Sequence, residues 1–206
     1  MVSRCGAPGR VAPKPIMYHP PVRLVLASRS PRRSALLSCA GYEFSVAPAD
    51  VDERIQPGEV AEVYVLRLAR DKVARVVGDY PDAAILGADT VVVVDGDVLG
   101  KPLDDEAAQM LRRLSGRTHE VVTGVALTAG DRWYLEVAST RVTFRDLTAE
   151  DIAWYLDSGE SAGKAGAYAI QGRASRFVTR IDGSYSNVVG LPVAVVDRLL
   201  KKLGAN

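Results

Sequence analysis

Asp89 has the setting that most strongly suggests chemistry, because it interrupts an apolar run with the character of a buried strand. The run lies within residues 84–102 and includes the four valines at 91–94. An ionised carboxylate in such a run costs several kcal/mol unless a cation, a metal or hydrogen bonds compensate it. Two interpretations remain open: the strand stops at Gly87 and Asp89 caps a turn, or Asp89 lies at a cleft and binds a metal or activates water.

Two arginines occupy a helical turn that normally prefers acids. Residues 23–27 read as a short strand, and Ser30 fits the N-cap of a helix whose first residue is proline. Arg32 and Arg33 then lie against the positive end of the helix dipole. Free amides, the hydroxyls of serines such as Ser28, and two guanidinium groups favour a phosphate cradle, although solvated surface arginines are the common alternative.

Another acid and two lysines fall on segments that could face a common cleft. Glu53 belongs to an acidic loop, and such acids are either solvated or supply oxygens to a metal. Lys72 lies beside the apolar stripe of a helix predicted over residues 59–78, which suits snorkelling or reaching into a cleft. Lys101 follows a glycine on a constrained loop, close to a hairpin turn predicted at residues 95–96.

Strands and helices are also predicted along the rest of the chain, with no internal repeat. We expect strands at residues 42–47, 119–128, 133–144 and 177–181, with the second and third joined by a turn at 130–131. We expect helices at residues 104–114 and 148–157, and a final helix that ends near residue 200. Lys164 and Gln171 lie in a glycine-rich segment at 159–172, and residues 183–192 read as a loop.

Composition places the chain among ordinary globular proteins. It has 206 residues, a formal net charge of +1, 48% apolar and 25% charged residues, which fits one large domain or two small lobes. Balanced charge argues against a dedicated binder of nucleic acid or membrane surfaces, and no apolar run approaches the ~20 residues that span a bilayer. Two cysteines and two histidines are too few for a disulfide scaffold, a Cys-rich zinc site or a His-based metal cage.

The first 21 residues differ in character from the rest. Residues 1–21 combine several prolines with scattered basic residues and have no continuous apolar core, so they do not resemble a secretory signal. We expect them to form a disordered N-terminal extension and the protein to be cytoplasmic.

Six segments, taken in order, resemble the Maf family of nucleotide pyrophosphatases. They are ASRSPRRSALL, LARDKV, LGADTVVVVDGDVLGKP, LSGRTHEVVTG, GKAGAYAIQG and GSYSNVVGLP, within residues 23–200. The resemblance is strongest to the branch that acts on dTTP, UTP and modified uridine triphosphates. One departure is ESAGKAG, where the family often has a proline-containing GEPxDKAG; the change keeps Lys164, which we expect to bind substrate.

The resemblance implies a two-lobed α/β fold over residues 22–206: a mixed β-sheet with flanking helices, inosine-triphosphatase-like, with the active-site cleft between the lobes. It implies a homodimer that hydrolyses a nucleoside triphosphate to a monophosphate and pyrophosphate with a divalent cation, Mg²⁺, Mn²⁺ or Co²⁺. Asp89 would carry over as the general base. The remaining binding and catalytic residues would be Ser28, Arg32, Arg33, Glu53, Lys72, Lys101 and Gln171.

The chemistry of a triphosphate agrees with this set of residues. Its negative charge repels an incoming hydroxide, so the reaction needs cations around the phosphate oxygens. The candidates for that clamp are Arg32, Lys72 and Lys101. Glu53 and Asp89 would be the metal or base carboxylates, in roles that could be exchanged. We expect in-line attack of water at the α-phosphorus without a covalent intermediate, because His119 is the only internal histidine and no serine or cysteine nucleophile is supported.

Gln171 bears on which base is bound. Its amide offers one donor and one acceptor, which match the N3–H and a carbonyl of uracil or thymine. The family branch that prefers 7-methyl-GTP tends to have an acid at this position, which suits the positive charge of a methylated guanine. We therefore expect Arg33, Thr90 and Gln171 to line a pyrimidine site.

Three functions remain in competition. The leading one is a house-cleaning pyrophosphatase that removes non-standard or excess pyrimidine nucleotides, with no stable nucleic-acid or membrane partner. The alternative is a regulatory nucleotide- or nucleic-acid-binding protein in septum formation and cell-division arrest, and Asp89 argues against it because a pure binder gains nothing from a carboxylate beside a polyphosphate. A phosphatase of the haloacid-dehalogenase type is suggested by residues 91–97, but the later paired-acid metal motif it needs is missing.

Overall fold

A computed structural model describes residues 23–103 and 106–204. The extension predicted at residues 1–21 therefore lies outside the described residues. Within them the chain forms one mixed seven-stranded sheet in the order β2-β1-β3-β5-β6-β7, with β4 paired to β3. The strands are β1 (Arg23–Leu26), β2 (Phe44–Val46), β3 (Ala83–Val94), β4 (Asp97–Leu99), β5 (Thr118–Ala129), β6 (Arg132–Phe144) and β7 (Val178–Asp182). The α-helices are α1 (Pro31–Cys39), α2 (Ala61–Val76), α3 (Glu106–Leu114), α4 (Ala149–Leu156), α5 (Tyr185–Val189) and α6 (Val193–Gly204).

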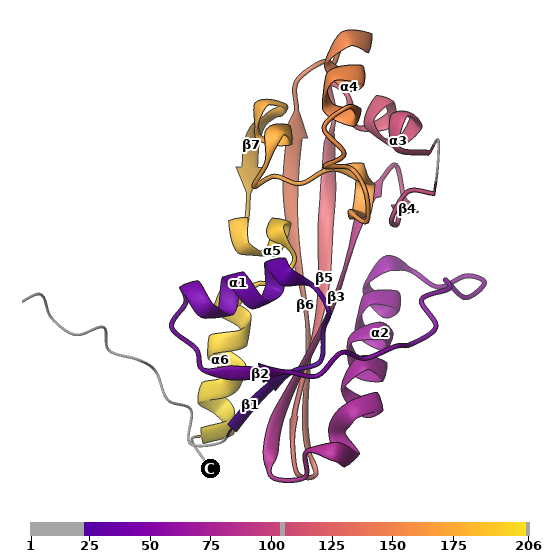
Figure 1. Ribbon diagram of the computed structural model, residues 1–206. Helices are drawn as coiled ribbons and strands as arrows, with labels where there is room; N and C mark the ends of the chain where they lie inside the picture. The colour runs from indigo at the N-terminus through magenta and orange to yellow at the C-terminus, as the bar shows by residue number, and fades with distance from the viewer. Residues whose placement is uncertain (1–22, 104–105, 205–206) are drawn as a thin grey trace, which may run out of the picture.

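Three long antiparallel strands, β3, β5 and β6, run through the whole molecule and join two lobes (Figure 1). The lower lobe in Figure 1 adds β1 and β2, which pair in parallel beside the first part of β3, together with α1, α2 and α6. The upper lobe adds β4, β7, α3 and α4. This is the two-lobed mixed sheet with flanking helices that the family resemblance implied.

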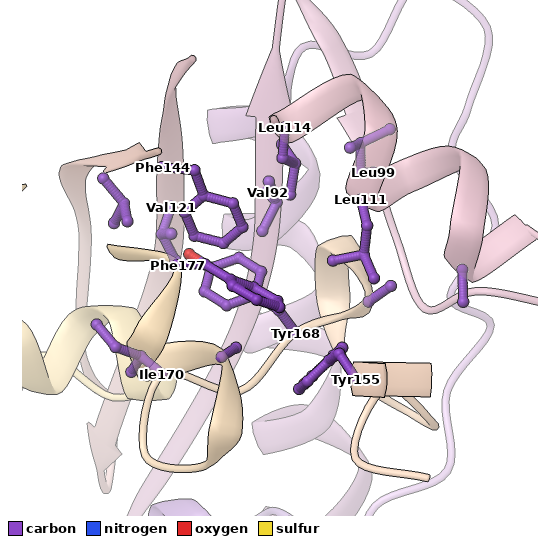
Figure 2. Close-up of a cluster of buried hydrophobic side chains, with 14 of the residues drawn as sticks. Val92, Leu99, Leu111, Leu114, Val121, Phe144, Tyr155, Tyr168, Ile170 and Phe177 are labelled. Carbon is purple, nitrogen blue, oxygen red and sulfur yellow. The ribbon is translucent and has the colours of Figure 1, made fainter. Parts of the chain in front are cut away.

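Each lobe has its own apolar core. In the upper lobe, aromatic rings pack edge to face (Figure 2). Phe144 of β6 contacts Tyr168, which precedes η3 (Arg173–Arg176), and Phe177, which directly precedes β7. In the lower lobe, α6 covers one face of the sheet and α2 covers the other. The long strands thus carry two cores with a boundary between them, and that boundary is where a cleft can form.

Helix α2 lies directly against the sheet because two glycines face it. A Cβ atom on Gly87 of β3 would lie 2.4 Å from the backbone oxygen of Ala69, and one on Gly124 of β5 would lie 2.4 Å from the backbone carbonyl of Val65. Neither clash could be relieved by a side-chain movement, because the atoms met are helix backbone. Glycine at both positions therefore sets the distance between α2 and the strands.

Strand β3 continues without interruption through Asp89. The interpretation in which the strand stops at Gly87 and Asp89 caps a turn is wrong. Asp89 lies directly opposite Gly124 of β5 in the antiparallel register, and the residue is only 8% exposed. A buried carboxylate inside a strand needs a compensating partner.

Local signals in the sequence placed several elements correctly. Asp95 and Gly96 both have positive φ, 52° and 83°, as the predicted β3–β4 hairpin turn requires. Thr148 and Asp151 form a capping box at the start of α4. Ser30 does occupy the N-cap of α1, but its side chain makes no capping hydrogen bond.

The predicted loop at 183–192 is wrong in part, because it contains the short helix α5. The side chain of Ser184 caps that helix by accepting a hydrogen bond from the backbone N–H of Asn187. This N-cap serine lies within a segment whose glycine and proline residues had favoured a loop. No helix in the described ranges is both long and apolar enough to cross a bilayer.

The contact between α2 and the strands yields a stability prediction. Gly124→Ala should lower the free energy of unfolding by about 1–3 kcal/mol, because the new methyl group must push the backbone of α2 away from β5. Urea unfolding monitored by circular dichroism measures the change. Gly78→Ala is the matched control, because a Cβ there meets nothing within 4 Å; equal losses in the two variants would contradict this account of the packing.

Candidate active site

A cavity of about 640 Å³ lies at the boundary between the two lobes. It opens beside the part of β3 that pairs with neither β1 nor β4. Strand β1 pairs with β3 only up to Leu86, and β4 pairs with β3 only from Val92. Successive strand residues point to opposite faces, so Asp89 and Thr90 reach this cavity from the two sides of the sheet. The cavity therefore surrounds the free edge of β3, at a point where the strand order switches, which is a common ligand site in open α/β sheets.

All ten residues expected from the sequence to form a site line this one cavity. They are Ser28, Arg32, Arg33, Glu53, Lys72, Asp89, Thr90, Lys101, Lys164 and Gln171. Five segments supply them: the β1–α1 turn with the start of α1, the loop after β2, helix α2, strand β3 with the loop after β4, and the glycine-rich segment that contains η2 (Ala165–Ala167). Their proximity is a finding, and their individual roles stay predictions.

Lys72 and Asp89 form a buried ion pair at the base of the cavity. Lys72 Nζ lies 2.5 Å from Asp89 Oδ1, and the two residues are 6% and 8% exposed. Lys72 reaches the strand because α2 lies close to Gly87 and Gly124. Breaking a buried pair of this kind costs about 3–5 kcal/mol, so each charge depends on the other.

Glu53 joins this pair and links it to the upper lobe. Its Oε1 accepts a hydrogen bond from Lys72 Nζ at 2.8 Å, and its Oε2 accepts one from Lys101 Nζ at 2.7 Å. Partial burial works to raise the pKa of Glu53, but the hydrogen bonds from Lys101 and Lys72 prevail and lower it to about 2. Glu53 is therefore ionised throughout the physiological pH range.

Arg33 is held on three sides by protein acceptors. Its Nε donates to the backbone oxygen of Gly190 at 2.8 Å, Nη1 donates to Ser28 Oγ at 3.2 Å, and Nη2 donates to Thr90 Oγ1 at 3.2 Å. A guanidinium carries five N–H donors, so two remain after these contacts. Arg33 is 9% exposed and lines the cavity. Arg33 is thus a fixed fork and not a solvated surface arginine.

Arg32, Lys164 and Gln171 are less constrained. Arg32 lies half-buried at the cavity, and within the described part of the chain no carboxylate lies within salt-bridge distance of it. Lys164 Nζ donates to the backbone oxygen of Ala162 at 2.9 Å, while burial, followed by the charge of Arg32, lowers the pKa of Lys164. Gln171 is exposed at the upper-lobe side. These side chains can move to meet a ligand, which the Arg33 fork cannot.

Sequence reasoning missed three groups that shape the cavity. Thr123 of β5 shares a 2.9 Å hydrogen bond with Thr90, and the backbone oxygen of Gly190 receives Arg33. Tyr168 lines the cavity and contacts buried His119 through a 2.9 Å hydrogen bond. The cross-strand register of β3 and β5 could have indicated Thr123, but a backbone acceptor such as Gly190 leaves no signal in the sequence.

Asp89 and Glu53 are carboxylates of the cavity whose oxygens could bind a divalent cation. No cluster of three or more His, Cys, Asp and Glu side chains in the described ranges could hold a metal by itself. Asp89 and Glu53 nevertheless contact the same ammonium group, so their oxygens lie close together. Mg²⁺ is usually bound by one or two carboxylates, with waters and substrate phosphates completing its shell. This donor set fits a cation that arrives with a polyphosphate.

Comparison with known proteins agrees with the geometry. Residues 23–203 match the family described as Maf-like protein. The chain is 53% identical over 186 residues to the dTTP/UTP pyrophosphatase of Hahella chejuensis, covering 88% of this chain and 92% of that protein. It is 50% identical over 190 residues to the dTTP/UTP pyrophosphatase of Koribacter versatilis, covering 92% and 98%. The protein of the same name from Myxococcus xanthus is 53% identical over 182 residues, covering 88% and 92%.

The histidine behind the cavity yields a pH prediction. Burial lowers the pKa of His119 from 6.5 to about 4, so between these values the unfolded chain binds a proton that the folded protein does not. This contribution to stability is present above pH 6.5 and is lost as the pH falls toward 4. Between pH 7.5 and pH 5 the loss should be about 2 kcal/mol, measured by urea unfolding.

His119→Gln provides the comparison. The variant has no imidazole to titrate at this position, so its stability should change much less between pH 7.5 and pH 5 than that of the wild type. An equal slope in both proteins would show that His119 does not titrate differently in the folded and unfolded states.

Proposed function

Because this chain belongs to the family of Maf-like proteins, we propose that it hydrolyses a pyrimidine nucleoside triphosphate, dTTP or UTP, to the monophosphate and pyrophosphate. One observation carries the proposal: a cluster of the buried residues Lys72 and Asp89 with the more exposed Glu53 lies in the same cavity as the amino end of α1. A cavity that held only a neutral ligand would have no use for these charges at its base.

The cationic groups of the cavity suit a triphosphate tail. Arg32 and Arg33 lie in the first turn of α1, whose free amides and dipole favour an anion. Lys101 and Lys164 stand on the upper-lobe side of the same cavity. A tail placed between the lobes would therefore meet positive charge from both of them, which neutralises phosphate oxygens and stabilises the pyrophosphate leaving group.

Asp89 is the general base of the proposal. Its Oδ1 contacts Lys72 Nζ, and within the described part of the chain its Oδ2 accepts no hydrogen bond. Oδ2 can therefore take a proton from a water molecule, while Lys72 holds the carboxylate in place. The water oxygen bonds to the α-phosphorus, the bond to the β-phosphate bridge breaks, and the pyrophosphate leaves with that bond's electron pair. His119 is 2% exposed and faces Tyr168, so it takes no part in the proton transfer.

Asp89 and Glu53 are also the residues that would hold a divalent cation. When bound, such a cation would supply Lewis-acid stabilisation of charge on the phosphate oxygens. Both carboxylates already contact Lys72, so a bound cation would share its ligands with that ammonium group. We propose Mg²⁺, Mn²⁺ or Co²⁺ because these cations accept oxygen ligands.

The pyrimidine would lie toward the upper lobe. Gln171 lines the cavity beside Ile170 and Tyr168, which offer apolar surface next to an amide. Arg33 and Thr90 are hydrogen-bonded to each other on the opposite side of β3 from Asp89. A base held among these groups would leave the triphosphate free to reach the carboxylates. The homodimer and the cytoplasmic location stay predictions, as does any link to cell division.

Replacing the proposed base separates catalysis from binding. Asp89→Asn keeps the size of the side chain but cannot accept a proton, so pyrophosphate release from dTTP should fall by a factor of about 10²–10⁴. Pyrophosphate and orthophosphate are measured separately after incubation with dTTP and Mg²⁺. The thermal unfolding midpoint of each variant is measured in parallel, because Asp89 also pairs with Lys72.

Asp131→Asn is the control, since Asp131 is exposed in the turn between β5 and β6 and does not line the cavity. Its turnover should equal that of the wild type. Full turnover by a folded Asp89→Asn variant would contradict the assignment of the base, and release of orthophosphate by the wild type would contradict the proposed reaction.

The base site is tested by changing its amide to an acid. Gln171→Glu should lower kcat/KM for dTTP relative to 7-methyl-GTP by on the order of tenfold, because the carboxylate cannot donate to a pyrimidine carbonyl and attracts a cationic base. Gln109→Glu on the exposed face of α3 is the matched control and should leave the ratio unchanged. An unchanged ratio in Gln171→Glu would remove Gln171 from the base site.

A further inference from the structure

Thr123 of β5 is a buried residue whose hydroxyl takes no direct part in the proposed reaction. It lies opposite Thr90 of β3 in the antiparallel register, is 0% exposed and does not line the cavity. Its Oγ1 lies 2.9 Å from Thr90 Oγ1, and Thr90 Oγ1 in turn accepts a hydrogen bond from Arg33 Nη2 at 3.2 Å. Thr123 therefore lies behind a guanidinium that does line the cavity.

The direction of this hydrogen-bond chain follows from its protons. A hydroxyl has one proton to donate and two lone pairs that accept. Within the described part of the chain, Thr90 has two acceptors, Thr123 Oγ1 and the backbone oxygen of Gly190 at 3.3 Å, whereas Thr123 has no acceptor other than Thr90. If Thr90 donated to Thr123, the Thr123 proton would be buried without an acceptor, which costs more than a long hydrogen bond. Thr123 is therefore the donor to Thr90, and Thr90 donates to Gly190.

In this direction the hydroxyl of Thr90 is fully occupied. Its two lone pairs accept from Thr123 and Arg33, and its proton goes to the backbone oxygen of Gly190. Thr90 thus has neither a donor nor an acceptor left for a ligand. Arg33 still has donors to offer, because three of the five N–H groups of a guanidinium are used by its contacts with the protein.

We propose that Thr123 is a positioning residue, which fixes the Arg33 guanidinium through Thr90 so that the remaining N–H donors of Arg33 bind an oxygen atom of the substrate. The inference rests on the proposed function, because it names a contact that a nucleoside triphosphate would make. Arg33 belongs to α1, whereas Thr90 and Thr123 belong to adjacent strands, so the threonine pair ties a long side chain of the helix to the sheet. An arginine held in this way loses less rotamer entropy when the substrate binds.

Steady-state kinetics with dTTP test this role. Thr123→Val keeps the shape of the side chain but frees the Thr90 hydroxyl to rotate, so Arg33 loses a fixed acceptor. KM should rise by on the order of tenfold while kcat stays unchanged, as expected for a contact made equally in the ground state and the transition state. An unchanged KM would overturn the inference.

Two further variants of β5 provide the controls. Thr123→Ser retains the hydroxyl and should have the wild-type KM. Thr128 is also 0% exposed on the same strand, but its hydroxyl donates to the backbone oxygen of Arg132, away from the cavity. Thr128→Val therefore removes an equally buried hydroxyl and should leave KM unchanged. Equal rises of KM in Thr123→Val and Thr128→Val would reduce Thr123 to a structural residue and overturn the inference.

A double-mutant cycle tests the route through Thr90. Thr90→Val should itself raise KM for dTTP. Adding Thr123→Val to it should raise KM no further, because the two hydroxyls act in series on Arg33. A rise by the same factor in both backgrounds would show that Thr123 acts independently of Thr90, and it would overturn the proposal.

The binding of thymidine and of tripolyphosphate, each measured by calorimetry, identifies the oxygen atom. Thr123→Val should raise the dissociation constant of thymidine where Arg33 holds an oxygen of the nucleoside, and that of tripolyphosphate where Arg33 holds a phosphate oxygen. A rise for neither molecule would overturn the proposal.

Exchange of the Arg33 Nε–H with solvent, measured by NMR without a ligand, separates this inference from the proposed function. The rate should be on the order of tenfold higher in Thr123→Val than in the wild type, because a less fixed guanidinium releases its hydrogen bond to Gly190 more often. Thr128→Val should leave the rate unchanged. An unchanged rate in Thr123→Val would overturn the inference even if dTTP is hydrolysed. A wild type that released no pyrophosphate from dTTP would instead remove the proposed function, and the exchange rate would still decide whether Thr123 fixes Arg33.

Discussion

The buried ammonium group of Lys72, shared between Asp89 and Glu53, is the interaction on which the rest of the cavity depends. An ionised carboxylate inside a strand would be costly without it, and a lysine buried under a helix would be equally costly alone. The pair forms because Gly87 and Gly124 let α2 lie directly against β3 and β5. Two residues without side chains thus make a charged site possible in the middle of an apolar sheet. The close packing that stabilises the lower lobe also positions its chemistry.

The mixed sheet explains why the site lies between the lobes. Parallel strand β1 ends beside Leu86 and antiparallel strand β4 begins beside Val92, so β3 has an open interval where neither neighbour covers it. Arg33 and Thr90 approach this interval from one face, while Lys72 approaches from the other. Lys101 then reaches across to Glu53 and joins the lobes through a single carboxylate. A triphosphate entering here would contact the fixed guanidinium of Arg33 and the fixed Lys72–Asp89 ion pair, which can position it. The less constrained cationic side chains can then neutralise its charge.

Much of this arrangement was accessible from the sequence, and the limits have physical causes. Local rules located the β3–β4 hairpin through Asp95 and Gly96, because only a few residue types tolerate positive φ. Unusual placement located Asp89 and Arg33, because each carries a charge where its element disfavours one. The sequence could not decide whether the strand continued through Asp89, since that depends on Lys72, a residue seventeen positions away in another element. Thr123 and the carbonyl of Gly190 were missed for the same reason: their importance arises from contacts between distant segments.

A crystal structure with a non-hydrolysable α,β-methylene analogue of dTTP and Mg²⁺ would test the central claim most directly. The account requires the triphosphate to lie along the first turn of α1 and the cation to contact Asp89 and Glu53. It also requires Asp89 Oδ2 to be within reach, through one water molecule, of the α-phosphorus. A triphosphate bound away from the Ser28–Arg33 turn, or an α-phosphorus on the side of the cavity remote from Asp89, would contradict it.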